Sequence, residues 1–351
     1  MIGRTDSAML SVNGRISRHM WFEELMGFKE ESPEQVRERI SVSGPVLTSS
    51  SNGRSYRCGR LQIRSLGALR QDVRDAAVPC TGRLTLREIV ADVQDLHADP
   101  SNTGALFQVA SQFNLLEMTG PDVLPEMGVG IYEYDRTQGP ACAIACGAGT
   151  IFRNYFVEVN GRTGQSAGNQ IDCLAALGDA LDNSGDRLWT MSNGYALPSQ
   201  AGLHEIHDRL VSADETELDV LRQCLRIGIQ QDAQVTLRGR SHAVSQAYCS
   251  ALPVAYSRLP STVWEPFARL VLDAAYEATF CAAVLNALQT GSSRLFLTLL
   301  GGGAFGNNTE WIIDAVRRAV DRYRNAPLDV AIVSYGSSHP AVKRLVREAL
   351  S

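Results

Sequence analysis

Four glycines near the carboxyl end of the chain have the spacing of a phosphate-binding loop. An apolar, β-prone stretch, Leu295 to Leu300, runs into Gly301-Gly302-Gly303-Ala304-Phe305-Gly306, and a helical pattern follows, with Asn307 or Asn308 as its N-cap. Glycine has no Cβ, so backbone N–H groups can approach an anion closely, and the following helix adds the positive end of its dipole. The run therefore predicts a phosphate site; a tight turn without a ligand is the alternative.

Two familiar phosphate loops fit this run poorly. Gly301, Gly303 and Gly306 match the G-x-G-x-x-G spacing of dinucleotide-binding folds, but only about 45 residues follow, and such a fold needs several more strand–helix units after its loop. A Walker loop needs Lys-Ser/Thr after its last glycine, and Asn307-Asn308 stand there instead. The sequence thus argues against a nicotinamide-dependent dehydrogenase and against nucleoside triphosphate hydrolysis.

Four carboxylates are candidates for acid–base chemistry. Asp273 and Glu277 lie four residues apart on one face of an otherwise apolar helical stretch, and a buried carboxylate is costly unless it has a partner. The first half of this helix is predicted at the carboxyl edge of the sheet, near the glycine run. A solvated stripe or a core salt bridge are the alternatives. Asp172 and Glu117 are further candidates, and Asp172 can equally be a simple helix cap.

Composition narrows the class of protein. The 351 residues carry a formal charge of −5 with scattered basic residues, which argues against nucleic acid as a partner. No apolar run reaches the roughly 18 residues of a membrane span and the start is polar, so we expect a cytoplasmic protein without a membrane partner. The eight cysteines form no C-x-x-C pair and the six histidines no ligand motif. We therefore expect reduced core cysteines, no metal and no cofactor.

The chain divides into a short lead-in and an α/β core. Residues 1–82 form the predicted N-terminal extension, with a helix start at Ser32-Pro33, and residues 83–351 form the core domain. The polar range 157–240 is predicted to be an insertion at the surface. Short apolar runs predict buried strands and longer periodic stretches predict helices; the strands are 104–110, 295–300 and 328–334, and the helices 262–289 and 309–323.

The segment from Thr85 to Leu96 is ambiguous. Thr85-Leu86-Arg87-Glu88 is a capping box, and the apolar residues that follow it have helical spacing. The same stretch can be read as a strand that ends near Asp92. Sequence physics alone slightly favours the helix.

Four stretches in order resemble the macrodomain fold, a three-layer α/β/α module that binds ADP-ribose. Ile89 to Gln94 resembles its opening strand and turn, which favours the strand reading of the ambiguous segment. The other matching stretches are Leu106 to Leu116, Gln138 to Gly149, and the glycine run with the strand from Val330 to Tyr335. The resemblance implies a macrodomain-like mixed sheet over 83–351.

The usual N-A-A-N of the family is replaced by Val109-Ala110-Ser111-Gln112, and its first glycine loop is reduced to Gly139-Pro140. The strings Q-V-A-S-Q-F-N-L-L-E, T-Q-G-P-A-C-A-I, R-N-Y-F and L-G-G-G-A-F-G-N instead resemble the divergent MavL-like class of arginine-specific macrodomain hydrolases. The resemblance implies that ADP-ribose is bound by Asp92 and Tyr335 at adenine, by residues 301–307 at the diphosphate, by Asn114 at the distal ribose, and by Gln112, Arg153 and Asn154.

The function expected from the sequence is therefore hydrolysis of ADP-ribose from modified arginine side chains. Asp273 and Glu277, with Asp172 and Glu117 as further candidates, would supply acid–base chemistry or hold the guanidinium. The alternative is a reader that binds ADP-ribose without chemistry. The expected partner is ADP-ribose or an ADP-ribosylated protein.

Overall fold

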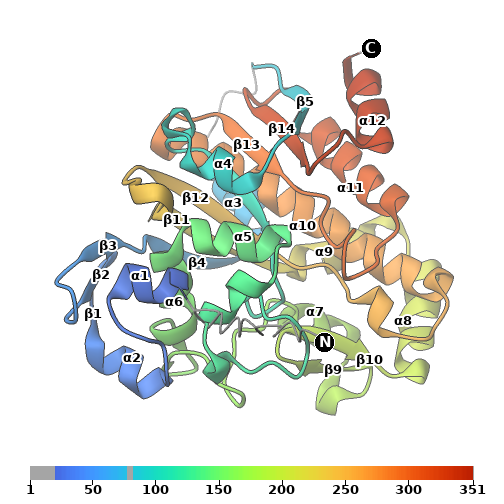
Figure 1. Ribbon diagram of the computed structural model, residues 1–351. Helices are drawn as coiled ribbons and strands as arrows, with labels where there is room; N and C mark the ends of the chain where they lie inside the picture. The colour runs from blue at the N-terminus through green and yellow to red at the C-terminus, as the bar shows by residue number, and fades with distance from the viewer. Residues whose placement is uncertain (1–19, 77–81, 351) are drawn as a thin grey trace, which may run out of the picture.

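A seven-stranded mixed sheet forms the centre of the protein in the computed structural model, which describes residues 20–76 and 82–350 (Figure 1). Five neighbouring strands run parallel, and β11 is antiparallel to both of its neighbours. The strands in spatial order are β4 (Arg60–Ser65), β11 (Arg226–Gln234), β12 (Ala243–Cys249), β6 (Leu106–Ala110), β13 (Arg294–Leu297), β14 (Asp329–Ser334) and β5 (Thr85–Val90). The carboxyl ends of the five parallel strands therefore meet at one edge of the sheet, which is where ligands bind in open α/β sheets.

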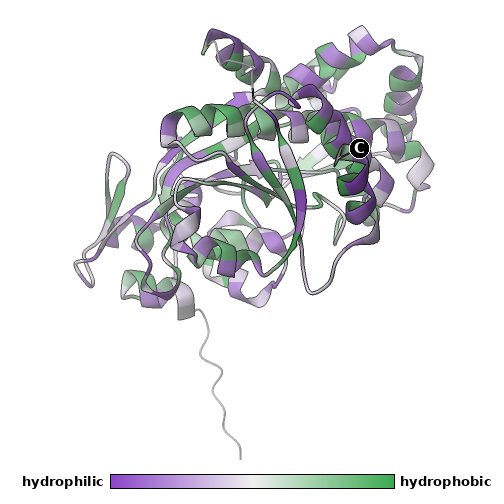
Figure 2. Cartoon of the chain, turned by 90° about the horizontal axis from the view of Figure 1, so that it is seen from above, coloured by the Kyte–Doolittle hydropathy of each residue, from purple (hydrophilic) through white to green (hydrophobic). Residues whose placement is uncertain are grey.

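Helices cover both faces of the sheet (Figures 1 and 2). On one face α10 packs against β6, β11, β12 and β13, with α3 and α11 beside it, and α12 continues from α11 to β5. On the other face α5 packs against β6 and α6 against β11, and α4 packs on α5. The bounds are α3 (Leu66–Asp75), α4 (Val93–Ala98), α5 (Gln138–Ala145), α6 (Gly147–Tyr155), α10 (Ser261–Thr290), α11 (Thr309–Arg322) and α12 (Pro340–Leu350). This confirms the predicted three-layer α/β/α arrangement.

The elements predicted around the glycine run are confirmed. The three predicted strands are β6, β13 and β14, and the two predicted helices are α10 and α11. The expectation that no segment is apolar enough to span a membrane is not met. α10 is long and apolar enough to cross a membrane, with a mean hydropathy of 1.3 over its most apolar window, but 83% of that window is buried inside the protein. Its apolar surface is thus used in core packing.

The ambiguous segment is a strand followed by a short helix. β5 pairs with β14 over its whole length, from Thr85 opposite Asp329 to Val90 opposite Ser334. The side chain of Asp92 then caps α4 by accepting a hydrogen bond from the backbone N–H of Gln94 at 2.7 Å. The helical pattern that begins at Thr85 is overridden because all six residues of β5 pair with β14, a long-range contact that a local sequence pattern cannot show.

The N-terminal region is only partly separate from the sheet. Its elements are α1 (Met20–Met26), α2 (Pro33–Arg39), β1 (Ile40–Ser43), β2 (Val46–Ser49) and β3 (Ser55–Arg57). The predicted helix start is confirmed, since the Ser32 side chain accepts a hydrogen bond from the N–H of Gln35. However, β4 is an edge strand of the main sheet and α3 packs on α10. The predicted boundary at residue 82 therefore does not divide the chain into two units.

The predicted insertion 157–240 also contains part of the sheet. Residues up to Cys224 lie outside the sheet as β7 (Glu158–Val159), β8 (Arg162–Thr163), α7 (Ala175–Leu181), β9 (Trp189–Ser192), β10 (Tyr195–Pro198), α8 (Gln200–Ser212) and α9 (Glu215–Cys224). The remainder includes β11, an internal strand. The polar residues of this range led to the prediction of a surface segment. In β11, however, the polar residue Gln230 is fully buried and donates a hydrogen bond to the carbonyl of Cys58 at 2.7 Å.

Candidate functional site

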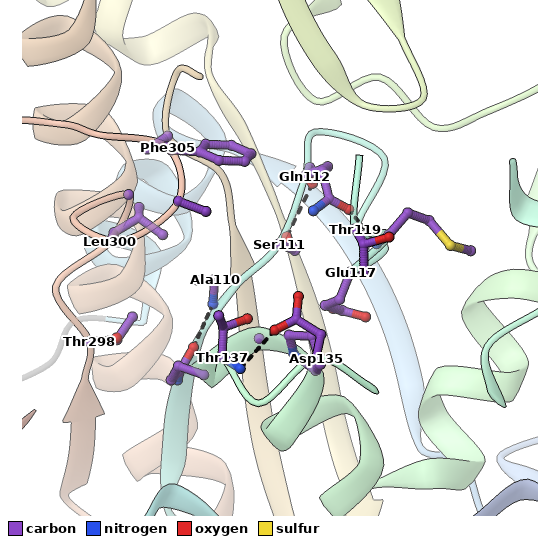
Figure 3. A pocket seen from close by; sticks show the side chains of 18 of the residues that line it. Ala110, Ser111, Gln112, Glu117, Thr119, Asp135, Thr137, Thr298, Leu300 and Phe305 are labelled. Atoms are coloured by element: carbon purple, nitrogen blue, oxygen red, sulfur yellow. Dashed lines mark hydrogen bonds between the residues drawn. The ribbon is translucent and has the colours of Figure 1, made fainter. Parts of the chain in front are cut away.

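A cavity of about 240 Å³ opens at the carboxyl edge of the sheet, between the ends of β6, β12 and β13 (Figure 3). One wall is the glycine loop after β13, from Thr298 to Phe305. The opposite wall is made by the segment after β6, which carries Glu117, and by the start of α5. Segments far apart in the chain thus enclose one space; its polar lining residues include Ser111, Gln112, Glu117, Thr119, Asp135, Thr137, Gln138, Tyr195, Tyr256 and Thr298.

The glycine loop at the cavity contains backbone N–H groups that lack a protein acceptor. Among the described residues, the N–H groups of Gly301, Gly303, Ala304 and Phe305 have no protein acceptor, although all four residues line the cavity. The loop is held from behind by Asn307, which is buried and donates from its side chain to the carbonyl of Leu252 at 2.8 Å. Neighbouring N–H groups without a protein acceptor can bind an anion. The structure thus assigns Asn307 to supporting the loop.

The physical reason for glycine differs among the positions of the loop. Gly301 and Gly306 have φ of 74° and 68°, a region that favours glycine, and a Cβ on Gly306 would lie 2.8 Å from the Cβ of Ala255. A Cβ on Gly302 would lie 3.1 Å from Ile312, so this glycine permits packing on α11. A Cβ on Gly303 would meet nothing within 4 Å. Only Gly303 lacks a conformational or packing reason, and it is the position where close approach of a ligand would explain glycine.

Glu117 places a buried carboxyl at the cavity. Its side chain is 1% exposed, and neither carboxyl oxygen has a hydrogen-bond partner among the described residues. The guanidinium of Arg153 lies 3.6 Å away, close enough for an ion pair but not for a hydrogen bond. Burial raises the pKa of Glu117 from its ordinary 4.5 to about 8, although the charge of Arg153 acts in the opposite direction. A carboxyl that titrates near neutral pH in a cavity is suited to general acid–base catalysis.

The backbone around Glu117 is tightly fixed. Gln112 lines the cavity and its side-chain oxygen accepts a hydrogen bond from the N–H of Met118 at 2.9 Å. Leu115 has φ of 63°, a conformation that is uncommon outside glycine, and its carbonyl accepts a hydrogen bond from Arg153. The side chain of Asn114 accepts from the N–H of Leu116 and donates to Gln170 at 2.8 Å. Asn114 therefore fastens this turn to the insertion, and it does not line the cavity.

Asp135 is a cavity residue that sequence reasoning missed. Its carboxylate accepts a hydrogen bond from the N–H of Thr137 at 2.8 Å, just before α5 begins (Figure 3). Gln138 ties this corner to β6, since its side chain accepts from the N–H of Ala110 and donates to the carbonyl of Gln108. Gly139 allows the close approach, because a Cβ there would overlap the carbonyl oxygen of Ala110. An aspartate two residues before Thr-Gln-Gly-Pro was the only available signal.

Asp273 and Glu277 lie elsewhere and are ion-paired. Glu277 is fully buried and accepts hydrogen bonds from Arg70 at 2.6 and 2.8 Å, and its carboxylate lies 2.8 Å from Arg322. Asp273 lies 3.2 Å from Arg222. Neither residue lines the cavity. The expected pair at the glycine loop is thus corrected to a salt-bridge network, because these side chains point from α10 toward α3, α9 and α11.

Two further predicted residues have structural contacts away from the cavity. The carboxylate of Asp172 accepts a hydrogen bond from the N–H of Leu174 at 2.8 Å, but the N-cap residue of α7 is Leu174 and not Asp172. The side chain of Asn154 donates to the carbonyl of Pro125 at 3.0 Å and is buried. Neither residue contributes to the cavity lining.

Asp92 and Tyr335 share the carboxyl edge without lining the cavity. They follow β5 and β14, whose last residues Val90 and Ser334 are paired in register. Tyr335 is 81% exposed. The same corner is connected to the cavity wall, since the side chain of Gln94 donates to the carbonyl of Ala141 on α5 at 3.2 Å. The two residues therefore lie beyond the cavity on the same edge of the sheet.

Three aromatic rings close one side of the cavity, and only Phe305 among them was expected. The ring of Tyr195 from β10 lies 5.2 Å from that of Phe305 and 5.3 Å from that of Tyr256, which belongs to a short 3₁₀ helix, Val254–Tyr256. The hydroxyl of Tyr195 donates to the carbonyl of Met118 at 2.9 Å. The insertion thus reaches the segment that carries Glu117. No local pattern marks the two tyrosines, which meet only in three dimensions.

Metal-ligating side chains do not cluster in the described part of the chain. No group of three or more His, Cys, Asp or Glu residues there is arranged to hold an ion. The seven described cysteines are free, and all but Cys224 are buried; Cys80 lies outside the described residues. Burial raises the pKa of the buried thiols, for example to about 11 for Cys249. They are therefore protonated core residues at neutral pH.

Comparisons with known proteins show a likeness at the level of structure only. No family model matches the sequence, and neither does any curated protein. A structure of poly(ADP-ribose) glycohydrolase from Thermomonospora curvata bound to the inhibitor ADP-HPD is similar with a TM-score of 0.43 and 13% identity, covering 90% of this chain and 96% of that chain. The same enzyme from Deinococcus radiodurans is similar in apo form with a TM-score of 0.41 and 12% identity, covering 83% of this chain and 94% of that chain. These similarities are too distant to assign any residue of the site.

Proposed function

We propose that this protein hydrolyses the glycosidic bond of ADP-ribose attached to arginine side chains. The observation that carries the proposal is that one cavity joins two features. The first is the set of N–H groups without an acceptor among the described residues, those of Gly301, Gly303, Ala304 and Phe305, and the second is the buried carboxyl of Glu117. Such N–H groups can bind a diphosphate without a basic side chain. The carboxyl can exchange a proton with the reacting group.

In the proposed binding mode the ligand follows the carboxyl edge of the sheet. Adenine lies beside the exposed ring of Tyr335, with Asp92 as the acceptor for its amino group, as the macrodomain resemblance implies. The diphosphate lies on the glycine loop, and the distal ribose reaches the carboxyl of Glu117. This order matches the order of the strand ends, since β13, which precedes the glycine loop, lies between β14 and β6.

The proposed reaction uses Glu117 as both acid and base. At neutral pH its raised pKa keeps the carboxyl protonated, so it can donate that proton to the leaving guanidino nitrogen. The carbon–nitrogen bond breaks, its electron pair stays on nitrogen, and positive charge develops on the ribose carbon. Water adds to that carbon and returns its proton to the carboxylate of Glu117. The products are ADP-ribose and an arginine guanidinium, and Glu117 is again protonated.

The charges at the cavity favour an arginine substrate. Within residues 20–76 and 82–350, the ionisable acids that line the cavity are Glu117 and Asp135, and no lysine or arginine lines it. Asp135 can pair with a guanidinium through two parallel hydrogen bonds. The leaving group in poly(ADP-ribose) is instead an uncharged ribose oxygen, which gains no ion pair from an acidic wall. The guanidinium is therefore the leaving group that suits this wall of the cavity.

The test is release of free ADP-ribose from an arginine-ADP-ribosylated peptide. We expect turnover by the wild type, and a loss of about 10²- to 10⁴-fold in kcat for Glu117→Gln, since a general acid contributes that much. The affinity of Glu117→Gln for ADP-ribose in calorimetry should stay close to wild type. Asp135→Asn should raise KM for the arginine peptide and leave the affinity for free ADP-ribose unchanged.

Two further substrates test separately whether the protein is a hydrolase and whether it is specific for arginine. Poly(ADP-ribose) and a serine-linked ADP-ribosyl peptide are incubated under the same conditions. Release from poly(ADP-ribose) alone would remove the arginine assignment and retain the hydrolase. Tight ADP-ribose binding with no release from any of the three substrates would identify a reader and overturn the proposed activity.

A further inference from the structure

Arg153 is fixed in the protein interior beneath the cavity. It lies on α6, is fully buried and does not line the cavity. Its Nε donates to the carbonyl of Leu115 at 3.0 Å and its Nη2 to the hydroxyl of Thr150 at 3.2 Å. The guanidinium carbon lies 3.6 Å from the centre of the Tyr248 ring, a cation–π contact. These three contacts hold the group in one place, outside the lining of the cavity, so they do not support the expected contact of Arg153 with ADP-ribose.

The fixed guanidinium faces Glu117. Nη2 of Arg153 lies 3.6 Å from a carboxyl oxygen of Glu117, and Nη1 has no hydrogen-bond partner among the described residues. Both oxygens of Glu117 are also without a partner there. Opposite charges at this distance interact strongly in a buried site, where water screens them little. The pair is therefore coupled electrostatically, and the carboxyl oxygens of Glu117 have no hydrogen-bond partner among the described residues.

The other groups that face Glu117 differ from Arg153 in charge. The phenol oxygen of Tyr132, in the 3₁₀ helix Gly130–Tyr134, accepts a hydrogen bond from the backbone N–H of Glu117 at 3.0 Å. Burial raises the pKa values of Tyr132, of Tyr248 on β12 and of Cys142 on α5 well above their ordinary values, so all three are neutral. Asp135 shares the cavity and is acidic. Among these groups only Arg153 carries positive charge.

We propose that Arg153 is a positioning residue that holds the carboxyl of Glu117 toward the cavity and makes its charged form accessible during turnover. The inference rests on the proposed function, because it concerns the same carboxyl. A carboxyl that acts first as an acid and then as a base must be able to exist both protonated and ionised near neutral pH. Burial alone favours the neutral form, and a nearby positive charge offsets that preference. The fixed guanidinium supplies this charge without entering the cavity.

The experiment measures the titration of Glu117 directly. Protein with ¹³C-labelled glutamate side-chain carboxyls is titrated by NMR, and the Glu117 signal is identified by its loss in Glu117→Gln. Arg153→Gln keeps a neutral donor for the carbonyl of Leu115 and removes the charge. We expect its Glu117 to titrate at least one pH unit higher than in the wild type, since an opposite charge shifts a carboxyl by about 1–3 units.

Turnover of the arginine peptide gives the second readout. In Arg153→Gln we expect kcat at pH 7 to fall at least about tenfold, with KM within about threefold, because a carboxyl that holds its proton more tightly is a poorer acid. Arg153→Lys keeps the charge and should restore most of the titration and rate. Arg269→Gln removes the same charge from ion pairs with Glu265 and Asp314, which do not line the cavity; it is the matched control and should behave as wild type.

The outcomes separate the inference from the proposed function. An unchanged Glu117 titration in folded Arg153→Gln overturns the inference. If Arg153→Gln does not fold, a Glu117 titration in Arg153→Lys that moves up by as much as one unit overturns it as well, because the charge is still present. A shifted titration in Arg153→Gln without turnover by the wild type supports the coupling and removes the hydrolase assignment.

Discussion

At the scale of single residues, burial decides which carboxylate can do chemistry. Glu117 and Glu277 are almost equally inaccessible, at 1% and 0% exposed. Glu277 is neutralised by hydrogen bonds from Arg70, whereas the oxygens of Glu117 lack such bonds in the described part of the chain. An unsatisfied buried carboxyl destabilises the fold, so its retention at a cavity is consistent with a functional role.

The pH dependence of the free energy of unfolding should show the raised pKa of Glu117 without any substrate. Its folded-state pKa of about 8 lies above its ordinary 4.5, so the folded state binds more protons between these values and the stability of the wild type falls as pH rises through this window. Glu117→Gln lacks this proton. The free energy of unfolding of Glu117→Gln minus that of the wild type should therefore increase, as pH rises from 5 to 8, by up to about 1.4 kcal/mol per pH unit. Urea unfolding of both proteins across this range is the measurement; parallel stability curves would contradict the raised pKa.

At the scale of elements, the loop after β13 and the start of α5 form the two walls of the candidate site. The loop offers N–H groups, whereas Gln138 at the start of α5 uses its side chain to fasten the helix to β6. Tyr195 joins the insertion to the segment after β6. Strand ends thus set the positions, and the loops that follow them supply the functional groups.

The glycine loop can be tested at a position where fold and binding separate. Gly303→Val adds a side chain where no atom lies within 4 Å, so the thermal midpoint should change little. ADP-ribose affinity should fall at least about tenfold, because the side chain restricts approach to the N–H groups. Gly306→Ala is the contrasting variant, since its φ of 68° and its contact with Ala255 predict a lower midpoint. Calorimetry and thermal unfolding together decide; an unchanged affinity in Gly303→Val would show that the phosphate lies elsewhere.

At the scale of the whole molecule, the site depends on regions far from it. Leu116 and Met118, on either side of Glu117, belong to a second hydrophobic core with residues of the N-terminal region such as Phe22 and Val36. On the opposite face of the sheet, Arg70 of α3 bridges Asp219 of α9 and Glu277 of α10. The N-terminal region and the insertion are thus integrated into the sheet domain by burial and by charge.

Glu277→Gln should destabilise the protein without altering the site. It leaves Arg70, whose side chain is 7% exposed, without one of its two carboxylate partners, and breaking a buried ion pair costs about 3–5 kcal/mol. Denaturant unfolding measures the loss, and Glu265→Gln on the same helix is the control, because its half-exposed pair with Arg269 should contribute less than about 1 kcal/mol. ADP-ribose affinity and turnover of the folded variant should match the wild type. A selective loss of kcat at full stability would restore Glu277 as a catalytic candidate.

The local features of this protein can be predicted from its amino-acid sequence alone. The glycine run, the strands that became β6, β13 and β14, and the two long helices follow from apolar periodicity and from the conformational freedom of glycine, which act over a few residues. The roles of the charged residues, in contrast, depend on the folded arrangement of the chain. Arg70 pairs with Glu277 across 207 positions of sequence, and Arg153 lies 3.6 Å from Glu117 although the two residues belong to separate segments. Burial and charge pairing depend on which distant segments the sheet brings together, so only the folded chain separates a structural carboxylate from one that faces a cavity.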